Sequence, residues 1–201
     1  MPQSRAEIAQ RRKEEILEAA LRVFSRKGFH QATNRDIADE AGIASPGLIY
    51  HYFEDKQDLL RHLLERLNPA LQLLSSPGDF LELPLREGLL CFARRFLEVN
   101  QRSDLLRVIL GEALRDPAMA QNLFEAGPAR GLGFLSAWLA RHVESGKLRP
   151  LPTTDLARQF VAPLLGATVF AVVFRREDFP ADAEFIVDTF CLLYTSPSPR
   201  D

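Results

Sequence analysis

EILEAALRVFSRKGFHQATNRDIADEAGIASPGLIYHYFEDKQDLL, residues 15–60, is the stretch that decides the fold. Its first part carries apolar side chains at a spacing of three and four, the pattern of an amphipathic helix. These side chains are Ile16, Leu17, Ala20, Leu21 and Phe24. We therefore predict a helix over residues 10–27 that ends at Gly28, directly after the basic residues Arg26 and Lys27.

A short second helix is predicted by a capping box. In this motif the side chain of the residue before the helix bonds the backbone amide three residues later, and the side chain of that later residue bonds the first residue's amide. Thr33 and Asp36 have this spacing. Asp is a weaker partner than Glu in this motif. The helix holds Ile37 and Ala38 on its buried face and ends at Gly42.

A third helix is predicted to begin with Ser45 as its cap and Pro46 in its first position, with Ile49 and Phe53 facing inward. Two short helices joined by a tight, glycine-containing turn form a helix-turn-helix unit, here about residues 33–53. The second helix of such a unit enters a DNA major groove about 12 Å wide. The side chains off its buried face are Pro46, Gly47, Tyr50, His51 and Tyr52.

The wider run closely resembles the DNA-binding segment of the tetracycline-repressor (TetR) family over about residues 10–70. The anchors of this resemblance are Ile16, Leu17, Phe24, Gly28, Phe29, Ile37, Ala38, Ala41, Gly42, Tyr50, Phe53 and Lys56. One departure is the turn at residues 42–47, because the family's commoner turn has one residue fewer. We therefore align the motif backwards from Tyr50.

The resemblance implies a role for each matching position. Thr33 and the N-terminus of its helix would meet a phosphate, which free amide groups favour. Base edges would face Pro46, Gly47 and Tyr50, and phosphates would be clamped by His51, Tyr52 and Lys56. The complete set of expected DNA-contacting residues is Thr33, Arg35, Ser45, Pro46, Gly47, Leu48, Tyr50, His51, Tyr52 and Lys56. Helix capping alone would also explain Thr33 and Ser45, and a solvated lysine would explain Lys56.

Further helical patterns fill the rest of the chain. Asp55 is predicted to cap a helix that reaches about Leu74, and Ser75–Gly78 then marks a boundary between domains at 10–70 and 79–190. Helical patterns continue at residues 84–100, 103–115, 117–144, 154–174 (with Thr154 as a possible cap) and 180–190. The chain is predicted to be all-α, with about nine helices.

The second domain is rich in aromatic residues, of which Phe92, Phe96, Phe124, Phe134, Trp138 and Phe170 are candidates for a ligand pocket. Such residues are more often plain core than pocket, although pockets between bundle helices are lined the same way. The family resemblance implies that this region binds a small-molecule effector. It also implies a homodimer interface through about residues 155–190, which suits the very apolar helix 157–174.

The last segment, CLLYTSPSPRD (residues 191–201), breaks from the apolar pattern before it. It resembles the translated read-through of a sequencing adaptor, and we expect it to be an artefactual tail that replaces the native C-terminus. A genuine Ser/Pro-rich tail is the alternative that its composition allows.

Composition narrows the function classes. The 201 residues carry a formal net charge of -2, so any nucleic-acid binding must come from local placement of charge. Two isolated cysteines and an N-terminus without an apolar region predict a cytoplasmic protein with no signal peptide and no membrane partner. Neither nucleophile-elbow nor metal-ligand spacing is present, so we expect no enzyme, cofactor or metal.

We therefore expect a transcriptional regulator, most simply a ligand-responsive repressor that binds a palindromic, double-stranded operator as a homodimer. Two alternatives stay open at this point. The first is a helical small-molecule-binding protein with a vestigial helix-turn-helix, and the second is an all-α enzyme. Salt-dependent binding to DNA would separate the regulator from both.

Overall fold

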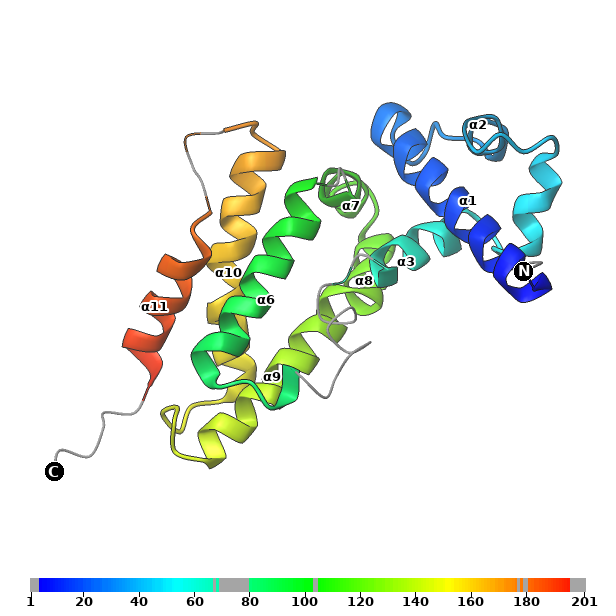
Figure 1. The fold of residues 1–201 in the computed structure, drawn as a ribbon. Coiled ribbons are helices and arrows are strands. Elements are labelled where there is room, and N and C mark those ends of the chain that lie inside the picture. The colour runs from blue at the N-terminus through cyan, green and yellow to red at the C-terminus, as the bar shows by residue number, and fades with distance from the viewer. Residues whose placement is uncertain are drawn as a thin grey trace, which may run out of the picture. The chain divides into compact units, whose positions relative to one another are not determined.

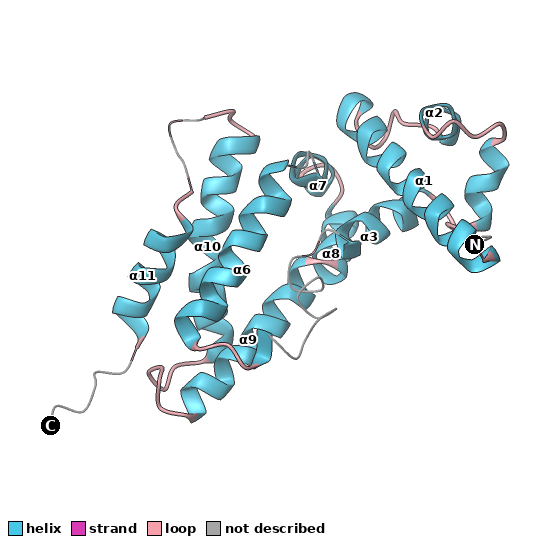
Figure 2. Cartoon of the chain, in the orientation of Figure 1, coloured by secondary structure: helices cyan, strands magenta, loops and turns pink. Residues whose placement is uncertain are grey.

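The computed structural model describes residues 4–66, 68, 80–102, 105–176, 178 and 181–195. Over these residues the chain forms nine α-helices and one 3-10 helix, and its only extended pairing is the isolated bridge between Leu148 and Thr195 (Figures 1 and 2). The prediction of an all-α chain is confirmed.

The chain divides by packing into two compact units. The head unit comprises residues 1–66 and 104–123, and the body unit comprises residues 67–103 and 124–201. Residues 104–123 thus pack with the head although they follow part of the body in sequence. Compact units are not the same as sequence domains, so the boundaries at 10–70 and 79–190 remain a prediction.

The head is built around its longest helix. Its elements are α1 (Arg5–Lys27), α2 (Asn34–Glu40), the 3-10 helix η1 (Pro46–His51), α3 (Lys56–Arg66), α7 (Leu105–Ala113) and most of α8 (Pro117–Ala126). Helix α1 packs against α2, α3 and α7, and α2 packs against η1. The centre of this core is the set of fully buried side chains Ile16, Val23, Phe24, Ile37, Ile49, Leu59 and Leu60.

Helix α1 begins five residues before its predicted start because it has a cap that the periodicity did not reveal. The Ser4 hydroxyl accepts a hydrogen bond from the Glu7 amide at 3.2 Å, and the Glu7 carboxylate accepts one from the Ser4 amide at 2.7 Å. This reciprocal capping box satisfies two amide groups that would otherwise lack partners. The predicted end of the helix at Gly28 is confirmed.

The body consists of α6 (Leu85–Arg102), α9 (Pro128–Glu144), α10 (Thr153–Val172) and α11 (Ala183–Tyr194). Helix α10 packs against α6, α9 and α11, and α11 also packs against α6 (Figure 1). Aromatic side chains dominate the core, in which Phe160 lies 6.1 Å from Phe92 and 5.2 Å from Phe190 between ring centroids.

Three helix boundaries of the second half were predicted wrongly. The expected helix 117–144 is two helices, because Gly127 and Pro128 end α8 and start α9. Thr154 does not cap α10, which follows Pro152 without a side-chain cap. Helix α11 is capped by Asp182 and runs to Tyr194, past residue 190. Helix α3 ends at Arg66, and residue 68 is not helical; the rest of its predicted extension, residue 67 and residues 69–74, lies outside the described residues.

Helix α10 is long and apolar enough to cross a bilayer on length and composition alone, with a mean hydropathy of 1.3 in its most apolar window. The core helix of a soluble protein passes the same test. Helix α10 packs against three other helices of the body, and 33% of this window is buried.

Candidate nucleic-acid interface

The first short helix of the motif is held by the predicted capping box. The Asp36 amide donates to the Thr33 hydroxyl at 3.1 Å, and the Thr33 amide and hydroxyl donate to the Asp36 carboxylate at 3.0 and 2.8 Å. Lys27 at the end of α1 donates a further bond to this carboxylate at 2.6 Å. The Lys27 bond, and after it the two Thr33 donors, lower the pKa of Asp36 to about 2. Asp36 is therefore ionised at the start of α2.

The turn after α2 orients the second helix of the motif. Gly42 has a φ of 66°, a left-handed conformation that L-residues with a side chain rarely adopt. It follows Ala41, the last residue with helical geometry, so the predicted end of α2 at Gly42 is confirmed. The next residue, Ile43, is buried against the head and anchors the turn.

The recognition segment differs from its prediction in two ways. It is a 3-10 helix rather than an α-helix, and the Ser45 side chain makes no capping hydrogen bond. The two findings share a cause. In a 3-10 helix the bonds span three residues, so the Leu48 amide, which a capping side chain would bond, already donates to the Ser45 carbonyl at 3.0 Å.

The same geometry sorts the side chains of η1 into rows, because residues three apart eclipse one another. Pro46, Ile49 and Tyr52 form the inner row, with Ile49 buried and the other two partly buried. Gly47 and Tyr50 form an outer row, and Tyr50 is 61% exposed. Pro46 and Tyr52, which we expected to face outward, therefore lie on the inner row.

Lys56 follows η1 as the first residue of α3. Its ammonium donates hydrogen bonds to three backbone carbonyls, of Phe29 at 2.9 Å, His30 at 3.3 Å and Ala32 at 2.8 Å. It also lies 4.9 Å from the centroid of the Phe29 ring, which is buried. Lys56 was expected as a phosphate clamp, yet in the free protein its ammonium binds the turn between α1 and α2.

The ten residues expected to contact DNA are distributed over one part of the head. The exposed ones are Thr33, Arg35, Ser45, Gly47, Tyr50 and His51, and the partly buried ones are Pro46, Leu48, Tyr52 and Lys56. Three of them, Thr33, Tyr50 and Lys56, line one open groove of about 660 Å³ together with His30 and Asn34. The structure thus brings together residues from α2, η1 and α3.

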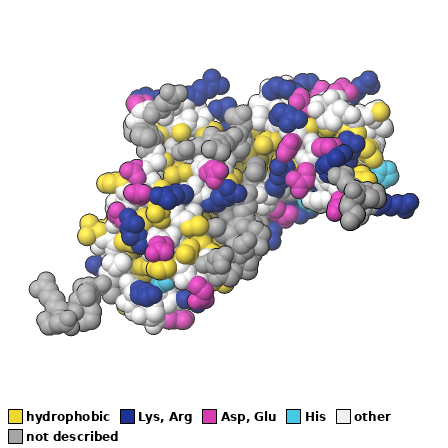
Figure 3. Space-filling model, viewed as in Figure 1, with side chains coloured by type: hydrophobic (Ala, Val, Ile, Leu, Met, Phe, Trp, Pro, Cys, Tyr) yellow, Lys and Arg dark blue, Asp and Glu magenta, His cyan; other side chains and the backbone are white. Residues whose placement is uncertain are grey.

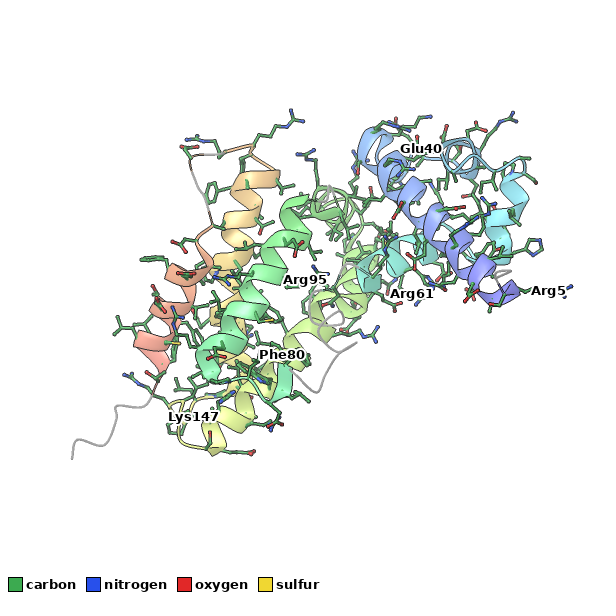
Figure 4. The ribbon with its side chains drawn as sticks, viewed as in Figure 1. Arg5, Glu40, Arg61, Phe80, Arg95 and Lys147 are labelled. Carbon is green, nitrogen blue, oxygen red and sulfur yellow. The ribbon has the colours of Figure 1, made fainter. Side chains whose placement is uncertain are left out.

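Most basic side chains of the head already have acidic partners. Arg22 and Arg26 both bind Glu40, which lies where α1 and α2 meet, and the two hydrogen bonds lower its pKa (Figure 4). Other pairs are Arg12–Glu15, Lys27–Asp36, Arg61–Asp58 and Arg66–Glu18. Positive and negative side chains accordingly alternate over the head surface (Figure 3). Among the described basic residues of the head, those without such an ion pair include Arg5, Lys13, Arg35, Lys56 and Arg115.

One polar contact of the head was not anticipated from sequence. His30 Nε2 lies 2.7 Å from Glu112 Oε2, at ion-pair distance, and Glu112 is 3% exposed on α7. The two residues are far apart in sequence, so no local pattern could have paired them.

The six aromatic residues expected to line a ligand pocket do not share one environment. Phe92 and Trp138 are buried in the body core, and Phe96 and Phe134 are partly buried. Phe124 and Phe170 are 48% and 42% exposed. Trp138 stacks obliquely on Phe80, which is labelled in Figure 4, with 5.2 Å between ring centroids. The Trp138 indole nitrogen is buried without a hydrogen-bond partner in the described part of the chain.

A helix-turn-helix with its solvent-facing recognition segment, in an all-α chain with a second helical unit, defines a class: the helical DNA-binding transcriptional regulators. Comparison with known proteins gives the same class. Residues 16–63 match the family described as "Bacterial regulatory proteins, tetR family", and residues 87–195 match "AefR-like transcriptional repressor, C-terminal domain". The chain belongs to the tetR family of bacterial regulatory proteins.

Individual relatives cover different shares of the chain. The HTH-type transcriptional repressor KstR2 of Mycolicibacterium smegmatis is 30% identical over 161 residues, which are 75% of this chain and 74% of that protein. The regulator YfiR of Bacillus subtilis is 39% identical over 79 residues, only 39% of this chain and 38% of that protein. The fatty acid degradation regulator FadR of Bacillus halodurans is 24% identical, with a TM-score of 0.71 over 90% of this chain and 96% of that one. This last likeness shows the fold.

Proposed function

We propose that this regulator is a repressor that binds a palindromic operator as a homodimer and releases it when a small molecule binds. The observation that carries the proposal is the outer row of η1. Gly47 lets the backbone approach a base pair closely, and Tyr50 extends a ring and a hydroxyl beside it. Arg35 and His51, both exposed, are suited to the flanking phosphates. KstR2, which is named a repressor, supports the direction of control.

A homodimer is supported by exposed apolar side chains on two helices of the body. Exposed large apolar side chains gather on α10, α11 and the residues just after α10: Leu165, Phe170, Phe174, Phe185, Leu192 and Leu193. Such a surface is unfavourable in water and suits a two-fold interface between copies of one chain. Two heads about 34 Å apart would then meet successive turns of one DNA face.

An apolar or amphipathic effector is supported by the aromatic interior of the body. FadR, which the body resembles in fold, is named for fatty acid degradation. The proposal places the protein in the cytoplasm and assigns it no catalytic activity and no cofactor.

Selection of DNA by the protein itself tests the proposal. From a random duplex library, the purified chain should enrich a palindrome, and its binding should weaken steeply with salt because phosphate contacts release counterions. Tyr50→Ala should then bind the enriched sequence about tenfold more weakly, with a smaller loss on random DNA. Leu114→Ala is the matched control, because Leu114 is an apolar head residue that is 88% exposed in the turn after α7.

Failure would take a definite form. If no sequence were enriched and binding did not depend on salt, the helix-turn-helix would be vestigial and the chain would be a small-molecule-binding protein. If Tyr50→Ala and Leu114→Ala behaved alike, η1 would not be the recognition element.

A further inference from the structure

Lys56 occupies an unfavourable place for its charge. It is the first residue of α3, and the free amide groups of a helix N-terminus carry partial positive charge, so a cation there is destabilising. Acidic side chains are the usual choice at this end of a helix, and Asp55 and Asp58 flank Lys56. A lysine at this position needs a compensating interaction elsewhere.

That interaction is a cup of backbone carbonyls in the turn between α1 and α2. The Lys56 ammonium has three N–H donors, and the carbonyls of Phe29, His30 and Ala32 accept from it. All the donors of the ammonium are therefore engaged before any DNA arrives. A phosphate could bind this ammonium only by displacing a carbonyl from it.

The turn whose carbonyls bind Lys56 leads directly into residues of the proposed DNA interface. Ala32 is followed directly by Thr33, which caps α2, and Arg35 lies in the first turn of that helix. At the other end, Phe29 is fixed in the core, with its ring centroid 5.2 Å from that of Phe24. Lys56 is also the first residue of α3, five residues after the end of η1. Its side chain therefore connects the start of α3 to the turn that precedes α2.

The geometry points to Lys56 as a positioning residue: its ammonium holds the α1–α2 turn so that Thr33 and Arg35 face the DNA, and it does not itself bind a phosphate. This assignment rests on the proposed DNA-binding function. It replaces the phosphate-clamp role that the family resemblance implied for this position. It also explains why the side chain is partly buried while Arg35 is exposed.

Two substitutions test the roles. Lys56→Arg keeps the charge, but the planar guanidinium cannot match three convergent carbonyls as a compact ammonium does. A phosphate ligand would tolerate arginine, whereas a positioning residue would not. Lys56→Met keeps most of the apolar stem and removes the ammonium. Lys56→Met should lower the slope of log K against log salt under either role, because it removes a phosphate ligand or misplaces Arg35. Lys56→Arg separates the roles: a phosphate ligand that stays cationic keeps the wild-type slope, whereas misplacement of Arg35 lowers the slope by about 0.9.

We expect both variants to bind the selected operator about tenfold more weakly than wild type, with salt slopes lowered by about 0.9 because Arg35 loses its phosphate contact. Arg35→Gln is the matched control, an exposed cation with no ion pair in the described residues, and should lower the slope by about 0.9. Wild-type affinity and a wild-type slope in Lys56→Arg would overturn the assignment.

Hydrogen–deuterium exchange of the free protein gives a readout that needs no DNA. Both Lys56 variants should exchange faster than wild type in the amides of residues 30–36, and Arg35→Gln should not, while the other peptides of α1 and α3 stay protected. Unchanged exchange at residues 30–36 would show that the turn does not depend on Lys56 and would also overturn the assignment. If wild-type protein selected no DNA, the proposed function would fail, and exchange would still decide whether Lys56 holds the turn.

Discussion

The head and the body are stabilised and specified in different ways. In the head, short elements are positioned by directional contacts: the Thr33–Asp36 capping box, the carbonyl cup around Lys56 and the ion pairs of Glu40. In the body, long helices pack through aromatic and aliphatic side chains whose contacts have little directional preference. Directional contacts use particular residue types at particular spacings, whereas apolar packing accepts many sequences. In the head, the contacts of individual residues can therefore be predicted from the sequence, whereas in the body only the helical pattern can.

The difference extends to charge. The chain carries nearly equal numbers of basic and acidic residues, and in the described part of the head many cations are bound by nearby carboxylates. Attraction to phosphates then depends on the cations that form no ion pair in the described part of the head, and Arg35 is one of them that lies within the motif. This makes the function of the head sensitive to single substitutions that barely affect its fold.

The largest effect we predict concerns packing in the body. A Cβ added at Gly88 would lie 2.3 Å from Cζ2 of Trp138. The indole cannot move away easily, because it is 2% exposed and its ring lies 4.5 Å from His142 between centroids. Gly88→Ala should therefore lower the free energy of unfolding by about 1–3 kcal/mol, as overpacking of a core does. Urea denaturation followed by circular dichroism measures the change.

Gly133→Ala is the control for this substitution, since the same methyl group meets no atom within 4 Å there. Gly133 is an exposed residue inside α9, so alanine should stabilise the protein by about 0.5–1 kcal/mol. If both variants had the same stability as wild type, the contact between α6 and Trp138 would be looser than the structure has it.

An intermediate effect is predicted for the caps of the head. Thr33→Ala removes a hydroxyl that caps α2 and should cost about 1 kcal/mol of stability. Ser45→Ala removes a hydroxyl that makes no capping bond and should change stability by less than about 0.5 kcal/mol. Thermal unfolding of the two variants beside wild type decides the point, and equal losses would mean that Ser45 caps its helix after all.

These caps show what sequence reasoning could and could not reach. The Thr33 box is complete within four residues, so its bonds follow from local spacing, as do the buried Ile37 and the end of α1 at Gly28. Ser45 and Pro46 have the same kind of local signal, but the segment closes as a 3-10 helix, which no residue type demands. Gly127 and Pro128 are a local signal for a break, but apolar periodicity continues across them, so periodicity alone predicts a single helix there.

Contacts between distant residues could not be predicted in this way. Lys56 reaches carbonyls 24 to 27 residues earlier, and His30 meets Glu112 on a helix that follows part of the body in sequence. Backbone carbonyls are present at every residue, so the sequence carries no sign of which ones a lysine will bind. Pocket residues could not be told apart from core residues in the sequence, because core, pocket and interface use the same aromatic side chains.

The smallest effect we predict is a pH dependence in the body, where a titratable group lies within the packing. His142 is 7% exposed beside Trp138, and burial, followed by the charges of Lys147 and Arg141, lowers its pKa below the usual 6.5. The unfolded chain therefore takes up a proton near pH 6.5 while the folded chain resists it. Stability from this group is complete above that pH and declines as the pH falls through 6.5 toward the lower pKa of the folded state.

His142→Gln removes the titration, so its free energy of unfolding should decline less than that of wild type between about pH 7.5 and about pH 5.5. His51→Gln, at an exposed position of η1, should follow the wild-type curve. Urea denaturation at a series of pH values tests this, and parallel curves for wild type and His142→Gln would mean that the His142 ring reaches water and is not held neutral by the core.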